Sequence, residues 1–101
     1  MKIAFHSNQL GIRGTEVTMY DYAFYNRGLL GNDSIVIAPA NGDMSAKEKF
    51  ENQFNVLLYD NLDEITEICR GENVDAFWAI KGGENDGVVS HSCKNLIQCV
   101  F

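Results

Sequence analysis

The amino-acid sequence predicts an α/β domain, a three-layer sandwich in which helices cover both faces of a mainly parallel sheet. Short apolar runs alternate along the chain with segments whose apolar residues recur at helical spacing. The connections between these segments are short, and no linker or internal repeat interrupts them. The chain has 101 residues, which suits one domain, so residues 1–101 are treated as a single unit.

The first half of the chain predicts two strands with a helix between them. Residues 2–6 form a short apolar run bounded by polar residues, which is typical of a buried strand. Apolar residues repeat at helical spacing from Thr15 to Leu30, and Thr15 is a suitable N-cap. Residues 34–39 are rich in β-branched side chains and end at the only proline, which predicts the second strand.

The second half repeats this alternation. Residues 45–48 match a capping box, so a helix is expected to begin there, and residues 54–59 predict a third strand. Asp60 and Asn61 are expected to cap the next helix, and residues 75–81 and 95–101 predict the fourth and fifth strands. Such an order favours parallel strands joined by right-handed crossovers, which is a Rossmann-like arrangement.

The predicted sheet lacks a cover at its last strand. Both faces of a parallel sheet need to be buried, and no helix follows the apolar run at residues 95–101. We therefore expect a truncated domain that exposes apolar surface, and that self-associates or pairs with a missing domain.

Composition excludes several classes of function. The net charge is −6, and the eight basic residues are scattered, so neither nucleic-acid binding nor attraction to an acidic membrane surface is expected. No apolar run approaches the roughly 20 residues that span a bilayer, and no signal peptide is recognisable. Cys69, Cys93 and Cys99 have no metal-binding spacing and are expected to be free thiols. These features predict a cytoplasmic protein with no metal site.

Candidate binding residues lie in the loops that follow the predicted strands, because open α/β sheets bind ligands at the carboxyl ends of their strands. The loop after the first strand contains Gly11 and Gly14 and leads into a helix N-terminus, where backbone N–H groups can approach a phosphate. Arg13 would add a positive charge, whereas Glu16 would repel a phosphate. A glycine-rich turn before a capped helix, with no ligand, explains the same residues.

A second candidate is the segment from Lys81 to Gly87, which follows the fourth strand. Its lysine and glycines could line a cleft, although an acidic turn without a ligand has the same composition. His6 ends the first strand at the mouth of the expected cleft, and His91 precedes the fifth strand. Either histidine could serve as a base or a partner for a sugar hydroxyl, and a structural role is the alternative.

Three segments together resemble the N-terminal part of nucleotide-sugar-dependent glycosyltransferases of the GT-B architecture. They read KIAFHSNQLGIRGTEVTMYDYA, IKGGENDG and NLIQCVF, and they cover nearly the whole chain in the same order. In that architecture two Rossmann-like domains face each other across a cleft. The resemblance implies transfer of a sugar from a nucleotide-sugar donor to an unknown acceptor hydroxyl, with no cofactor.

The resemblance also implies which residues contact substrates. Those expected at the cleft are Gly11, Arg13, Gly14 and Thr15, with Lys81, Asn85 and Asp86 on its acceptor side. Gln98 stands where a histidine is expected, and the donor-binding C-terminal domain is missing. We therefore expect the chain to be inactive alone, with no residue assigned as nucleophile or base.

Two other hypotheses compete with the glycosyltransferase. One is a non-catalytic α/β binding or interaction module, a remnant of a larger enzyme. The other is a receiver-like or flavodoxin-like domain. A receiver needs acidic residues after the first strand, where this chain has His6, Ser7 and Asn8, and a flavodoxin needs a phosphate loop rich in serine and threonine. The last reading is therefore disfavoured.

Overall fold

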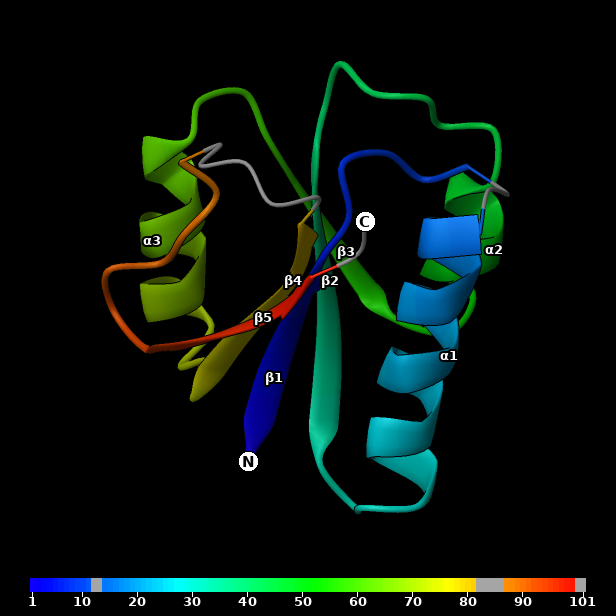
Figure 1. Ribbon diagram of the computed structural model, residues 1–101, viewed down its shortest axis with the longest axis horizontal. Helices are drawn as coiled ribbons and strands as arrows, with labels where there is room; N and C mark the ends of the chain where they lie inside the picture. The colour runs from blue at the N-terminus through cyan, green and yellow to red at the C-terminus, as the bar shows by residue number, and fades with distance from the viewer. Residues whose placement is uncertain (12–13, 82–86, 100–101) are drawn as a thin grey trace.

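The computed structural model describes residues 1–11, 14–81 and 87–99 (Figure 1). Eight elements follow one another along the chain: β1 (Lys2–His6), α1 (Gly14–Gly28), β2 (Asp33–Pro39), α2 (Lys47–Glu51), β3 (Asn55–Tyr59), α3 (Asp63–Gly71), β4 (Ala76–Lys81) and β5 (Lys94–Cys99). The predicted α/β class is confirmed.

The five strands form one sheet in the order β3-β2-β1-β4-β5, and every neighbouring pair is parallel. The first two strands, β1 and β2, are neighbours in the sheet, with Ala4 opposite Ile35. The chain runs outward from β1 to β3, and then crosses to β4 on the other side of β1. The order of the strands therefore reverses between β1 and β4, which makes this the switch point of the sheet.

Alternate residues of the central strands bury opposite faces of the sheet. Phe5 and Val36 belong to the core beneath α1 and α2, which we call the α1 face. Ala4 and Ile37 belong to the core beneath α3, the α3 face. Figure 1 shows α1 and α2 on one side of the sheet and α3 on the other, which gives the three layers. Complete burial of one such large apolar side chain stabilises a fold by about 1.5–3 kcal/mol.

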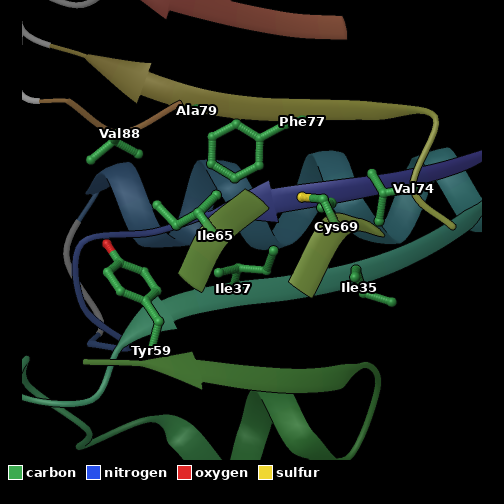
Figure 2. Packing of buried hydrophobic residues seen from close by; sticks show 10 residues of the cluster. Ile35, Ile37, Tyr59, Ile65, Cys69, Val74, Phe77, Ala79 and Val88 are labelled. Atoms are coloured by element: carbon green, nitrogen blue, oxygen red, sulfur yellow. The ribbon is translucent and has the colours of Figure 1, made fainter. Parts of the chain in front are cut away.

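The core of the α3 face is built around two residues of α3, Ile65 and Cys69, which lie four apart on one side of that helix (Figure 2). Both are almost completely buried, and they pack with Ile37 of β2 and Phe77 of β4. This is the spacing that a helix needs to present one apolar stripe to a sheet.

The described part of the crossover from β4 to β5, residues 87–93, is a loop that lies against α3. Val88 is buried in the same core as Ile65. The backbone N–H of His91 donates a hydrogen bond to Thr66 Oγ1 of α3 at 2.9 Å. These contacts hold the loop over the α3 face near β4. His91 itself is exposed.

Three predicted helix caps are wrong. Thr15 does not cap α1, because that helix begins at Gly14. Ser45 does not cap α2, whose N-cap is Ala46; instead the Ser45 N–H and hydroxyl both donate to the Asp43 carboxylate, at 2.9 and 3.2 Å. The N-cap of α3 is Leu62 rather than Asp60 or Asn61, and neither α2 nor α3 has a side-chain cap hydrogen bond. Before α2 the contact between Ser45 and Asp43 replaces the cap, as short polar side chains readily allow.

An apolar groove remains open on the α1 face, between α1 and β4. It has a volume of about 360 Å³ and is lined by Phe5, Tyr22, Tyr25, Asn26, Leu29, Leu30 and Trp78. Leu29 and Leu30 are 77% and 70% exposed. Leu96, which pairs with Trp78 across β4 and β5, is also exposed. Contiguous apolar surface of this kind is typical of a contact with another molecule. Across the described ranges, no helix is both long enough and apolar enough to cross a membrane.

We expect this groove to cause self-association. The double substitution Leu29→Gln/Leu30→Gln should lower the fraction of oligomer, because it replaces the two most exposed leucines of the groove with polar side chains. Sedimentation velocity over a range of protein concentrations measures the effect. Val17→Gln is the matched control, since Val17 is exposed on α1 but does not line the groove. Strictly monomeric wild-type protein at all concentrations would contradict the prediction.

Candidate functional site

The switch point places the loop after β1 and the end of β4 at one edge of the sheet. His6 ends β1 and pairs with Ala79, and β4 continues to Lys81. The chain leaves β1 toward the α1 face, whereas the described crossover after β4 lies on the α3 face. The carboxyl edge of the sheet at such a switch point is where ligands bind in open α/β sheets.

The loop after β1 is docked on the loop after β2. The backbone N–H of Leu10 donates to the carbonyl of Asp43, and the N–H of Ala46 donates to the carbonyl of Leu10, both at 2.7 Å. The Leu10 side chain is completely buried in the α1-face core. These bonds fix a segment that precedes a helix N-terminus, so its geometry is set before any ligand binds.

A glycine is required where the two loops meet. A Cβ added at Gly42 would lie 2.8 Å from the backbone oxygen of Asn8, which is too close for any side chain. A Cβ at Gly11 would lie 3.0 Å from Asp43 Oδ2 and 3.3 Å from Glu16 Oε1. Gly11 therefore lies between two carboxylates, and its lack of a side chain leaves them room.

Glu16 is the more buried of these two carboxylates. It lies in the first turn of α1, is only 2% exposed, and accepts a hydrogen bond from Gln9 Nε2 at 2.8 Å. A negative charge is favourable there because of the partial positive charge of the helix N-terminus. The same carboxylate occupies the position at which a phosphate would otherwise be attracted. Carboxylate oxygens accept hydrogen bonds, so this edge is better suited to hydroxyl groups than to phosphate oxygens.

His6 and Tyr59 lie beneath this edge, on the α3 face. Both are buried, and His6 Nε2 and the Tyr59 hydroxyl are 2.8 Å apart in a hydrogen bond that links the ends of β1 and β3. The imidazole also packs against Phe77, with the two rings tilted and their centroids 5.8 Å apart. The His6 side chain is only 3% exposed, so it lies below the edge rather than at its surface. Only the backbone of His6, as the end of β1, belongs to the edge itself.

The other predicted site residues are placed only in part. Gly14 and Thr15 begin α1, and Lys81 ends β4, so their backbones lie at the expected edge. Arg13, Asn85 and Asp86 lie outside the described residues. The structure thus brings Gly11 and the start of α1 to the same edge as the end of β4.

Sequence reasoning missed Gln9 and Asp43 as members of this site. Both are polar residues in loops that follow predicted strands, which is the only signal that the sequence carries for them. The approach of Asp43 to Gly11 arises only when the loops after β1 and β2 dock on each other, whereas the bond from Gln9 to Glu16 is made within the segment that joins β1 to α1.

A separate group of thiols lies on the α3 face. Burial raises the pKa of Cys69 from its usual 9.0 to about 11; a hydrogen bond with Ser90 opposes the rise, and the neighbouring Cys93 adds to it. Cys69 and Cys93 are both free. Among the described residues no group of three or more His, Cys, Asp or Glu side chains is arranged to hold a metal ion.

Comparison with protein-family models, with curated proteins and with solved structures finds no match for this chain.

Substitution of Gly42 and Gly11 tests the docking of the two loops. Gly42→Ala should lower the free energy of unfolding by about 1–3 kcal/mol, because its Cβ meets backbone. Gly11→Ala should cost less, since the exposed Asp43 carboxylate can move aside. Gly28→Ala is the control: nothing lies within 4 Å of its Cβ, and the change should be neutral or slightly stabilising. Urea denaturation measures all three, and equal effects at positions 28 and 42 would contradict the docking.

The pKa of Cys69 predicts a loss of stability at high pH. The folded state holds the Cys69 proton up to about pH 11, whereas an unfolded thiol loses it near pH 9.0. Between these values the folded state binds more protons, so its stability should fall by up to about 1.4 kcal/mol per pH unit. Thermal unfolding at pH 8, 9 and 10 of wild type and Cys69→Ala measures this. An identical pH slope in the two proteins would rule out the thiol as its source.

Proposed function

We propose that this chain is the N-terminal, acceptor-side domain of a GT-B glycosyltransferase that transfers a sugar from a nucleotide-sugar donor to an acceptor hydroxyl. The observation that carries the proposal is the preformed loop after β1 at the switch point, with Gly11 between the carboxylates of Glu16 and Asp43. The sequence resemblance assigns a substrate-contacting role to that same loop.

The acidic character of the loop suits the sugar of the donor better than its diphosphate. A sugar hydroxyl can donate a hydrogen bond to a carboxylate, whereas a diphosphate is repelled by it. We therefore assign the transferred sugar to the edge near Gly11, and most of the diphosphate to a second domain across the cleft. Electrostatic stabilisation of the departing diphosphate is the main catalytic contribution in such a reaction.

The sequence-predicted residues take complementary roles in this proposal. Arg13 supplies a positive charge at the donor, and Gly14 and Thr15 supply backbone N–H groups at the start of α1. Lys81, Asn85 and Asp86 contact the acceptor from the far side of the switch point. His6 supports the edge from below through its hydrogen bond with Tyr59.

This division of the site predicts that the 101-residue chain transfers no sugar and binds nucleotide sugars at roughly millimolar concentration. One wall of the cleft leaves most of the donor in water, so little of the cost of association is recovered. Calorimetry with several nucleotide sugars, followed by a transfer assay, measures both properties. Micromolar donor binding by this chain alone would contradict the proposal.

Restoring the second domain tests the individual residues. In the extended protein Arg13→Ala should weaken donor binding or turnover about tenfold, the effect of one charge-assisted hydrogen bond. Glu16→Gln should weaken sugar discrimination more than nucleotide affinity. Arg70→Ala is the matched control, because Arg70 is an exposed side chain that forms an ion pair with Glu67 on α3. Unchanged activity in Arg13→Ala would leave the loop with a structural role only.

The open groove on the α1 face favours a second candidate, a non-catalytic interaction module. Its lining is apolar and it is separate from the residues proposed to bind substrates. The coding sequence downstream of Phe101 discriminates the two. A second Rossmann-like domain in the same reading frame supports the glycosyltransferase, and its absence supports the interaction module.

A further inference from the structure

Two cysteines and a serine from separate parts of the chain meet on the α3 face. Cys69 lies in the last turns of α3, and Cys93 lies in the crossover just before β5. Cys93 Sγ donates a hydrogen bond to Ser90 Oγ at 3.4 Å, and Cys69 also contacts the Ser90 hydroxyl. Cys93 packs against the core to which Cys69 belongs. The two thiols are therefore neighbours that share one hydroxyl partner.

The backbone around these thiols is held in place by other bonds. The crossover is tied to α3 by the hydrogen bond from His91 N–H to Thr66, at 2.9 Å. Ser90 is further bonded to Asn95: its N–H donates to Asn95 Oδ1 at 2.9 Å, and its carbonyl accepts from Asn95 Nδ2 at 2.7 Å. Cys69 and Cys93 therefore lie on two segments that are bonded to each other next to the thiols.

A small oxidant can reach this cluster. A polar hollow of about 460 Å³ opens beside the end of α3 and is lined by Cys69, Arg70, Asn73, Val74, Asp75 and Ser92. Cys93 does not line this hollow, but it is only partly buried and so meets solvent directly, whereas Cys69 lines the hollow and is 1% exposed. Accessible thiols react with peroxides first, so Cys93 is the residue that meets the oxidant and Cys69 is the one that resolves it.

We propose that Cys69 and Cys93 form a reversible disulfide when the protein meets a two-electron oxidant such as hydrogen peroxide. The Cys93 sulfur attacks one peroxide oxygen, the O–O bond breaks, and a sulfenic acid and one water form. The Cys69 sulfur then attacks the Cys93 sulfur, the S–O bond breaks, and the departing oxygen takes the proton of the Cys69 thiol and leaves as a second water. Two thiols are oxidised to one disulfide, and one peroxide is reduced to two waters.

The disulfide would join α3 to the crossover loop across the core of the α3 face. The closed loop contains β4 and the segment between β4 and β5. A covalent bond over that distance restricts the unfolded chain, so the oxidised protein should be more resistant to unfolding than the reduced protein.

Tryptic peptides of the full chain identify the bond directly. Cleavage after Lys49, Arg70, Lys81 and Lys94 puts Cys69 in peptide 50–70, Cys93 in peptide 82–94 and Cys99 in peptide 95–101. After treatment with hydrogen peroxide and alkylation of the remaining thiols, mass spectrometry should show peptides 50–70 and 82–94 linked, and dithiothreitol should separate them. A dominant link to peptide 95–101, links only between chains, or thiols that stay free would each overturn the proposal.

Melting temperature supplies an independent readout. In a Cys99→Ser background, oxidation should raise the melting temperature by roughly 5–15 °C, and dithiothreitol should reverse the rise. Adding Cys93→Ser should abolish this rise in melting temperature. The reduced protein should still fold, because Cys93 is only partly buried. A cross-linked protein whose melting temperature equals that of the reduced protein would overturn the inference that the disulfide stabilises the fold.

Discussion

The burial of both faces of β1 and β2 is the constraint on which the rest of the structure depends. Ala4 and Phe5 are adjacent in sequence but belong to opposite cores, and Val36 and Ile37 repeat this in β2. A parallel sheet that buries both faces needs a helical layer on each side. Covering one face with α1 and α2 and the other with α3 then forces the chain to cross over β1, which creates the switch point.

The candidate site follows from that crossing. Its loops are held by the core beneath them: Leu10 is wholly buried, and its backbone bonds to the loop after β2. The loop consequently presents carboxylates at a helix start that by backbone geometry alone would attract an anion. The negative charge of Glu16 is favourable at that helix start, and its position follows from the same core that holds Leu10.

The strands and the main helices could be predicted from the sequence, because hydrophobic periodicity reports burial directly. The helix caps could not. Ser45 and Asp43 satisfy each other in a turn, and this competes with the cap that residues 45–48 suggest. The approach of Asp43 to Gly11 depends on how the loops after β1 and β2 dock, which is tertiary information. The contact of Cys69 with Cys93 likewise depends on the path of the crossover after β4.

The position of β5 has a consequence for local opening of the fold. It lies at the edge of the sheet beside β4 alone, and its residues Leu96 and Ile97 are half exposed on opposite sides. Amide hydrogens of β1 and β2, buried on both faces, should exchange with solvent only on global unfolding, whereas those of β5 should exchange through local fraying. The protein therefore has a gradient of protection across its sheet. The Gly11 side of the switch point rests on its slowest-exchanging strands, and the Lys81 side borders the strand that opens first.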